Sequence, residues 1–206
     1  MQELTFYFDF ISPYAYLGAE AIEALAARHQ RKVVWRPILL PVLLNANQQR
    51  GPAEIPDKRR YTYKHVQRVA HDHGLRVQHP PTHPFNPLLP LRACCLRPEA
   101  GLILPIFRAC WRDGLAIDSE ADLQSLVGED TLGRASSPEA KQALKDNTQE
   151  ALQAGVFGVP SVVADGEMFW GFDSFPHLER FLDGEDPVDP AKVESWNRLP
   201  ASASRI

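Results

Sequence analysis

The residues best suited to chemistry lie near the start of the chain, in the stretch ISPYAY at residues 11–16. Ser12 and Pro13 are residue types favoured at the N-cap and at the first position of an α-helix. The start of a helix offers free N–H groups and about half a positive charge, which stabilise an anion such as a thiolate. A serine hydroxyl can add a hydrogen bond to that anion. The stretch therefore fits either a plain helix cap or a thiolate-binding site.

Ser12 could also be a nucleophile, but its surroundings argue against that role. The G-x-S-x-G elbow of serine hydrolases is absent, and Pro13 follows directly. No general base can be assigned to Ser12 from the sequence. We therefore do not expect covalent catalysis by this hydroxyl.

A second candidate is Val159-Pro160, in the stretch GVFGVPS that precedes a predicted strand. A proline is allowed as the first residue of a strand and needs no function there. A cis peptide bond would instead expose the Val159 backbone to a ligand. Because only a few per cent of X-Pro bonds are cis, the residue pattern by itself favours the plain strand start.

Charged residues give weaker indications of a ligand-binding site. The stretch DKRRYTYK, residues 57–64, is typical of a solvated helix face, although Lys58 could bind a carboxylate across a cleft from Ser12. Asp173-Ser174 is most simply a helix cap, but it could also hold a charged group of a ligand.

Histidines and cysteines do not form a metal or redox motif. Four histidines lie close together in the sequence, at His71, His73, His79 and His83. They fall in a loop rich in glycine and proline, without the H-E-x-x-H pattern, so we expect solvated histidines and no metal. Cys94-Cys95 lies in an apolar stretch, where packing in the core is expected rather than redox chemistry.

These residues must be positioned by elements that the sequence also indicates. Residues 4–10 alternate apolar and polar side chains as a strand does, and residues 13–30 carry an apolar stripe at helical spacing. Residues 32–40 are typical of a second strand, in which Pro37 marks an edge, a bulge or the end. The order indicates a βαβ unit with parallel strands.

The middle of the chain, residues 55–154, shows helical patterns and no convincing strand. The predicted helices cover 57–73, 86–97, 101–113, 119–127 and 138–153. Strands at 161–164 and 167–170 follow, joined by a turn at Asp165-Gly166. The last predicted helix has an inner face of Phe175, Leu178, Phe181 and Leu182.

This order predicts an α/β protein with a thioredoxin-like core, βαβ…ββα, and a large all-helical insertion domain. The core would comprise residues 1–54 and 155–184, and the insertion residues 55–154. Residues 185–206 contain several prolines and are expected to form an irregular C-terminal tail.

Composition narrows the class of protein. The chain has 206 residues and a net charge of −4, which gives no reason to expect nucleic acid or an anionic membrane as partner. No apolar run approaches the roughly 20 residues of a membrane span, and no secretory signal is recognisable. Three cysteines without a C-x-x-C pair fit a reducing compartment, so a cytoplasmic location is expected.

Taken together, three stretches resemble one family. They are FYFDFISPYAYLG, FGVPS and WGFDSFPHLERFL, in this order. The chain resembles the 2-hydroxychromene-2-carboxylate isomerase family over roughly residues 4–184. That family is similar to kappa-class glutathione transferases, and both resemble the DsbA branch of thioredoxin-like proteins. Redox relatives carry C-x-x-C where this chain has Ser12-Pro13-Tyr14-Ala15, so thiol–disulfide exchange is not expected.

The resemblance implies a glutathione site with catalytic Ser12 hydrogen-bonded to the glutathione sulfur. Val159 would pair its backbone with the cysteinyl part of glutathione, ahead of a cis Pro160. The resemblance also implies that Gly171, Phe172, Asp173 and Ser174 hold the γ-glutamyl end of glutathione. It implies that Lys58 contacts glutathione and that Asn86 lies near the substrate.

Two departures from the family pattern bear on these roles. The family usually has an asparagine after the second strand, and Asn45, Asn47 and Gln49 compete for it here, with Asn47 preferred. Phe172 replaces a smaller or polar residue, so a contact through its side chain is not expected.

The function implied by the resemblance is a glutathione-dependent isomerase of a small aromatic carboxylate, acting as a homodimer. The reaction would open the ring of a 2-hydroxychromene-2-carboxylate with cis–trans isomerisation to a hydroxybenzylidenepyruvate. Two alternatives stay open: a kappa-like glutathione transferase that conjugates electrophilic aromatics, and a non-catalytic thioredoxin-like module that binds peptides beside Pro160.

Overall fold

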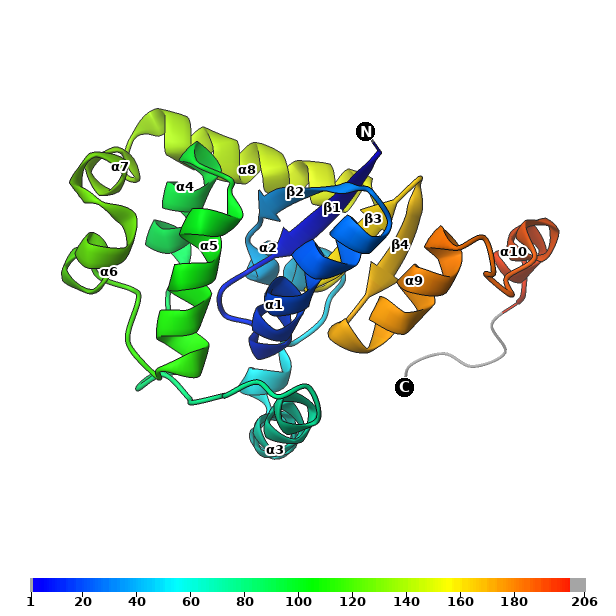
Figure 1. Cartoon of the computed structure of the whole chain (residues 1–206), viewed down its shortest axis with the longest axis horizontal. Helices are drawn as coiled ribbons and strands as arrows, with labels where there is room; N and C mark the ends of the chain where they lie inside the picture. The colour runs from blue at the N-terminus through cyan, green and yellow to red at the C-terminus, as the bar shows by residue number, and fades with distance from the viewer. Residues whose placement is uncertain (1, 201–206) are drawn as a thin grey trace.

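The computed structural model describes residues 2–200, which fold around one four-stranded sheet with the strand order β2-β1-β3-β4 (Figure 1). The strands are β1 (Glu3–Phe8), β2 (Lys32–Pro37), β3 (Ser161–Ala164) and β4 (Glu167–Trp170). β1 and β2 are parallel, whereas β3 is antiparallel to both of its neighbours. The predicted βαβ unit and hairpin are confirmed.

Helices cover both faces of the sheet. On one face, Phe6 and Phe8 of β1 pack in one cluster with α1 (Pro13–Arg28) and α9 (Phe175–Leu182). On the other face, Tyr7 packs in a second cluster with α2 (Leu40–Ala46) and α8 (Pro138–Gln153). Alternate side chains of β1 thus pack in two hydrophobic clusters, one on each face of the sheet. The C-terminal end of β1 lies between these clusters.

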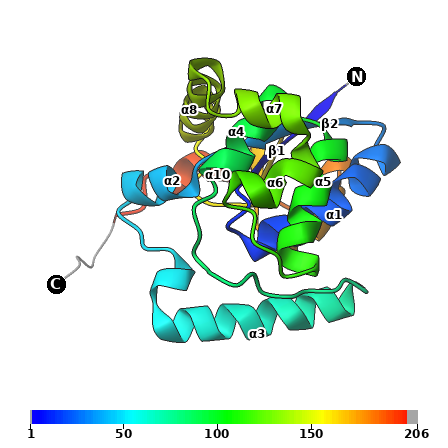
Figure 2. The same cartoon turned by 90° about the vertical axis from the view of Figure 1, so that its left-hand side faces the viewer.

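The segment between β2 and β3 is helical, as predicted. Besides α2 and α8 it contains the short η1 (Pro52–Glu54), α3 (Pro56–Asp72), α4 (Leu88–Leu96), α5 (Ala100–Phe107), the π-helical turn η2 (Arg108–Arg112), α6 (Glu120–Val127) and α7 (Glu129–Arg134). Figure 2 shows α3 along one side of the molecule, away from α4 to α8. The division of the chain at residues 55 and 154 stays a prediction.

Several elements differ from the prediction. No predicted helix covers α7, and the helix expected over 101–113 is divided into α5 and the π-helical η2. The second strand ends at Pro37, and Leu40 begins α2, so the expected strand over 32–40 is too long. The expected irregular tail is wrong for Pro190–Trp196, which forms α10. Asp189 caps this helix by accepting a hydrogen bond from the Ala191 N–H, with proline at the first position, which is the same signal that starts α1. The end of the tail, 201–206, lies outside the described residues.

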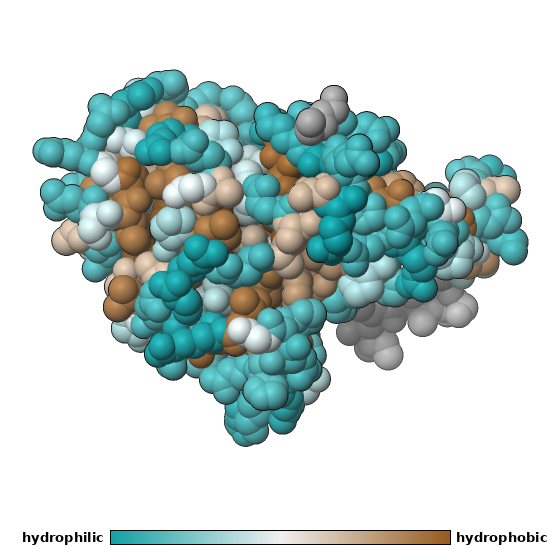
Figure 3. Space-filling model, in the orientation of Figure 1, coloured by the Kyte–Doolittle hydropathy of each residue, from teal (hydrophilic) through white to brown (hydrophobic). Residues whose placement is uncertain are grey.

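The surface over α3 is hydrophilic, as Figure 3 shows at the lower edge of the molecule. None of the helices within residues 2–200 has the length and apolar content that a membrane crossing requires.

Candidate active site

Ser12 begins α1 and is almost completely buried. Its Oγ accepts a hydrogen bond from the Ala15 N–H at 3.2 Å, which makes it the predicted N-cap. The same hydroxyl donates to the Val159 carbonyl oxygen at 3.4 Å. A donor–acceptor distance this long indicates a weak hydrogen bond, so the hydroxyl proton can turn to a stronger acceptor, such as an anion.

The peptide bond between Val159 and Pro160 is cis. The resemblance implied this geometry, whereas the residue pattern alone favoured an ordinary strand start, and that interpretation is wrong. Within residues 2–200 the Val159 N–H makes no backbone or side-chain hydrogen bond, although the residue is buried. A free N–H beside the Ser12 hydroxyl is what an incoming peptide-like ligand would pair with.

The turn after β4 lies next to Pro160, because the Gly171 N–H donates to the Pro160 carbonyl at 2.9 Å. Gly171 has φ +90°, and a Cβ there would lie 2.3 Å from Asp173 Oδ1. The Ser174 hydroxyl donates to the Gly171 carbonyl at 2.7 Å. Phe172 is buried, so the turn offers a ligand its backbone and the exposed Asp173.

Phe172 packs inward rather than toward a ligand. Its ring meets His73, the residue directly after α3, at 4.8 Å between centroids and Phe175 at 5.2 Å. The turn after β4 is thereby joined to the end of α3, and the expectation that Phe172 makes no side-chain contact to a ligand stays a prediction.

The start of α1 also faces α3 (Figure 1). The Tyr14 hydroxyl lies 2.8 Å from His65 Nδ1, and the His65 ring stacks on Tyr61. Burial, together with the nearby Tyr61 and Asp173, raises the pKa of Tyr14 to about 12, so the phenol stays protonated. Tyr61 and His65 thus form an aromatic rim on α3 that meets the start of α1 at Tyr14, two residues after Ser12.

Lys58 is exposed and stands on α3 three residues before Tyr61 and seven before His65. This spacing puts the three residues on one helical face. His65 on this face contacts Tyr14 of α1, whereas Lys58 is exposed two turns away, and its role stays a prediction.

The remaining predicted residues are not joined to Ser12 by hydrogen bonds in the described chain. The Asn47 side chain donates to the Leu43 carbonyl of its own helix at 2.9 Å, and Asn86 accepts from the Leu88 N–H at 3.1 Å. Asn45 and Gln49 are exposed at the end of α2. The choice among these residues therefore stays open.

Asp9 was missed by the sequence reasoning. It is fully buried, and its carboxylate accepts hydrogen bonds from the Ile11 N–H at 3.1 Å and the Leu40 N–H at 2.9 Å. Burial raises its pKa to about 7, with the two backbone hydrogen bonds acting in the opposite direction. The Asp9 carbonyl also accepts from the Ser12 N–H at 3.1 Å. The signal for it was an acidic residue between Phe8 and Phe10 in an otherwise apolar run.

Two of the four clustered histidines are not solvated, which corrects the expectation. His83 Nε2 donates to the Ile11 carbonyl at 2.8 Å, so its Nδ1 accepts from the Tyr63 hydroxyl at 2.8 Å. Burial lowers the pKa of His83 and favours this neutral form. His79 packs on Tyr63 at 4.1 Å between centroids. Both histidines therefore support the loop that leads to Ser12.

The same loop is held by Trp111, whose Nε1 donates to the Phe10 carbonyl at 2.7 Å. The other two histidines, His71 and His73, are exposed. Within the described residues no group of three or more His, Cys, Asp or Glu side chains could hold a metal ion.

The cysteines are free and unsuited to nucleophilic chemistry. Cys94 and Cys110 are buried, and burial raises the pKa of both thiols. The pKa of Cys95 rises to about 12 for the same reason. The expected core role of Cys94 is confirmed, and a reactive thiolate at the site would have to come from a ligand.

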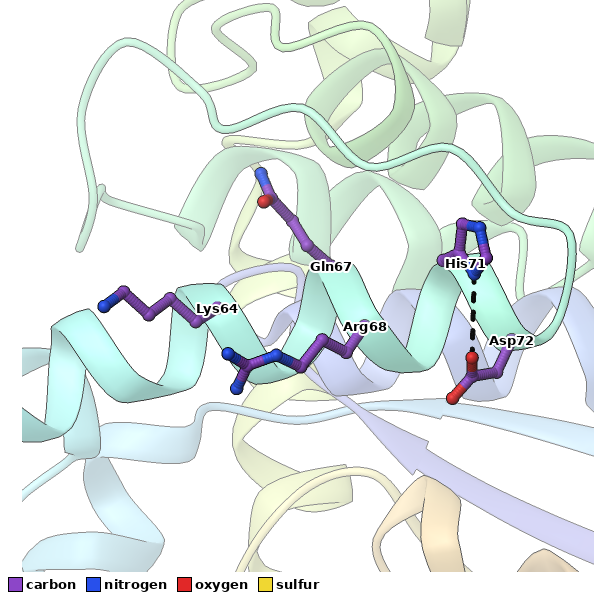
Figure 4. Close-up of a pocket in the computed structure, with 5 residues that line it drawn as sticks. All are labelled: Lys64, Gln67, Arg68, His71 and Asp72. Atoms are coloured by element: carbon purple, nitrogen blue, oxygen red, sulfur yellow. Dashed lines mark ion pairs between the residues drawn. The ribbon is translucent and has the colours of Figure 1, made fainter.

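A surface depression of about 440 Å³ lies along α3 (Figure 4). It is lined by Lys64, Gln67, Arg68, His71 and Asp72. It includes none of the residues around Ser12, and of its lining only Lys64 belongs to the stretch 57–64 that the sequence predicted as a solvated helix face.

The chain is similar in sequence to named proteins of two kinds. A protein from Pseudomonas putida named 2-hydroxychromene-2-carboxylate isomerase is 29% identical over 186 residues, covering 84% of this chain and 91% of that protein. A protein from Caenorhabditis elegans named glutathione S-transferase kappa 2 is 27% identical over 203 residues, covering 86% and 90% respectively.

The fold is likewise shared. A solved structure of a 2-hydroxychromene-2-carboxylate isomerase covers 96% of this chain and 100% of its own, with a TM-score of 0.80 at 24% identity. The resemblance expected from the sequence is thereby confirmed. A family model described as a DSBA-like thioredoxin domain matches residues 3–183, and the chain belongs to that family.

Proposed function

We propose that this chain is a glutathione-dependent isomerase that opens 2-hydroxychromene-2-carboxylate-type rings with cis–trans isomerisation to a hydroxybenzylidenepyruvate. The observation that carries the proposal is the meeting of the Ser12 hydroxyl, the start of α1 and the free Val159 N–H in one buried place. The named relatives supply the reaction class, since they are isomerases and kappa-class transferases.

The residues present fit glutathione. Val159 offers a backbone N–H without a partner in the described chain, which suits the cysteinyl backbone. The Gly171 turn, with exposed Asp173 and half-buried Ser174, would hold the γ-glutamyl end, and Lys58 would attract a carboxylate. The chain's own thiols have raised pKa values, so the thiolate would be that of glutathione.

When bound, glutathione would supply a thiolate that adds to a conjugated carbon of the substrate and later leaves, so that a double bond can rotate. The chain's part is to lower the pKa of that thiol from about 8.5. Ser12 would donate a hydrogen bond to the sulfur, and the α1 N–H groups would add positive potential. Two such contacts are worth roughly one or two pKa units, at about 1.4 kcal/mol each.

The direct test is a spectrophotometric assay with 2-hydroxychromene-2-carboxylate, with and without glutathione. Turnover only with glutathione, which is not consumed, is the expected result. Thermal stabilisation by millimolar glutathione should accompany it. If glutathione neither stabilises the chain nor supports turnover, the proposal fails.

A second candidate function is a kappa-like glutathione transferase, which the similarity to the nematode transferase favours. The two activities differ in the fate of glutathione. With a chlorinated aromatic as substrate, a transferase consumes glutathione and releases chloride. An isomerase turns over its own substrate at constant glutathione concentration.

We further propose that the chain acts in the cytoplasm as a homodimer, with no nucleic acid or membrane partner. These points are supported by the charge of −4 and the three unpaired cysteines, and by the family resemblance for the dimer. Light scattering of the purified chain tests the oligomeric state.

A further inference from the structure

The aromatic rim, Tyr61 and His65 on α3, has an exposure and a packing that a purely structural role does not require. Tyr61 is 62% exposed although it is a large ring, and it lies nearly parallel to His65, with an interplanar angle of 14°. The other edge of His65 lies against Tyr14, whose hydroxyl is 2.8 Å from His65 Nδ1. Tyr61 is therefore open to solvent at one end of this row of rings, and Tyr14 at the other end follows the Ser12 cap by two residues.

Tyr14 and Tyr63 both have an imidazole nitrogen as hydroxyl partner, but only the partner of Tyr63 has a fixed tautomer. His83 Nε2 donates to the Ile11 carbonyl, whereas His65 Nε2 makes no hydrogen bond within residues 2–200. Tyr16, on the same helix as Tyr14, donates its hydroxyl proton to the Arg76 carbonyl at 3.0 Å, which can only accept. The partner of Tyr14 is an imidazole nitrogen, which accepts in one tautomer and donates in the other. With the proton on His65 Nδ1, the Tyr14 oxygen accepts, and its O–H is free for a ligand.

The position of the rim fits a ligand that extends beyond glutathione. The Gly171 turn lies against both helices that carry these rings, because Phe172 packs on His73 directly after α3 and the turn also contacts α1. Lys58 lies on the same helical face as Tyr61, one turn away. A flat ring and a cation on α3 and a hydrogen-bond donor at the start of α1 are thus available to one ligand.

We propose that Tyr61, His65 and Tyr14 form the subsite for a planar aromatic 2-oxo acid. The aromatic ring of the ligand packs on Tyr61, its ketone oxygen accepts a hydrogen bond from Tyr14, and its carboxylate lies toward Lys58. His65 is a positioning residue that directs the Tyr14 proton. The inference rests on the proposed function for the identity of the ligand and deepens it by assigning the substrate's place.

The test uses binding without glutathione, so that no turnover is needed. Benzylidenepyruvate carries the ring, the ketone and the carboxylate, whereas cinnamate lacks the ketone. Calorimetric titration of both acids would compare the wild-type chain with Tyr61→Leu, Tyr14→Phe and the matched control Tyr16→Phe, which removes a hydroxyl from the same helix outside the site.

Tyr61→Leu should weaken the binding of both acids by about 3- to 10-fold, because an aromatic contact is lost. Tyr14→Phe should weaken only benzylidenepyruvate, again by about 3- to 10-fold, since one hydrogen bond is lost. Tyr16→Phe should bind both acids like the wild type. If Tyr14→Phe does not fold, His65→Phe keeps a ring beside Tyr61 but no longer orients the Tyr14 hydroxyl. It should weaken only benzylidenepyruvate, by less than Tyr14→Phe would, and unchanged binding of both acids would contradict the role of His65.

Three outcomes would overturn the subsite. In the first, all variants bind both acids equally well; in the second, the wild type binds neither acid; in the third, Tyr16→Phe shows the same loss as Tyr14→Phe. Glutathione stabilisation and turnover, measured separately, distinguish the two proposals. Turnover with unaltered binding in the variants refutes the subsite alone. The expected binding pattern without any turnover leaves the subsite standing and refutes the isomerase.

Discussion

The stability of the chain should fall as pH rises through the range in which Asp9 ionises. Asp9 is fully buried, and its pKa is raised from 3.8 to about 7. Between these values the folded state binds a proton that the unfolded state has lost, so the free energy of unfolding decreases with pH. The full difference corresponds to roughly 4 kcal/mol, at about 1.4 kcal/mol per pKa unit, and is reached above about pH 7.

Urea denaturation of the wild type and Asp9→Asn between pH 4 and pH 8.5 measures this effect. Asparagine leaves one of the two backbone N–H groups without its acceptor, so it carries a constant penalty and no titration. The difference between the two unfolding free energies should move in favour of Asp9→Asn by several kcal/mol as pH rises, and level off above about pH 7.5.

A matched control is Asp57→Asn, which removes a carboxyl that is 92% exposed. It corrects for the general effect of losing one acidic group. A free-energy difference between wild type and Asp9→Asn that does not change with pH would refute the reasoning, because it would mean that Asp9 has the same proton affinity in both states.

Three further predictions concern the site and its support. Ser12→Ala should raise the pH at which bound glutathione ionises and cut turnover by about tenfold or more, because a hydrogen bond to an anion is lost. A pH titration of thiolate absorbance measures the ionisation, and unchanged activity would rule out the role of Ser12. Gly171→Ala should cost about 1–3 kcal/mol because of its positive φ, whereas Gly101→Ala, which meets nothing within 4 Å, should cost nothing in the same thermal melts. His83 should make the chain less stable as pH falls below 6.5, because burial lowers its pKa and the unfolded state then binds the extra proton; His83→Phe should lose this part of the acid sensitivity, and an identical acid profile in the variant would contradict it.

The parts of the fold that were predicted from sequence depend on local chemistry. Ser12-Pro13 begins α1, and Asp165-Gly166 joins β3 to β4, because a cap and a two-residue turn are specified by neighbouring residues. α2 was missed because the apolar run from Ile38 to Leu44 has no periodicity that separates a strand end from a helix start.

The support of the site could not be predicted because it is built from distant segments. His83 reaches the Ile11 carbonyl across 72 residues, and Trp111 reaches the Phe10 carbonyl across 101. Whether a histidine is solvated depends on which segments pack on it, and the sequence of a loop does not specify that. The cis bond at Pro160 could be predicted only from the family resemblance, since residue types alone favour a trans bond.

The hydrogen bond from the Ser12 hydroxyl to the Val159 carbonyl joins residues that are 147 positions apart in the sequence. During synthesis, which runs from the N-terminus, α1 and its cap emerge long before the strand that β1 pairs with on its antiparallel side. Until residue 164 has been made, the aromatic strand β1 lacks one neighbour and shows an open edge, the kind of surface that promotes aggregation of nascent chains. The ligand site is therefore among the last parts of the molecule to form, and shortened chains that end before β3 should be handled by chaperones and should not bind glutathione.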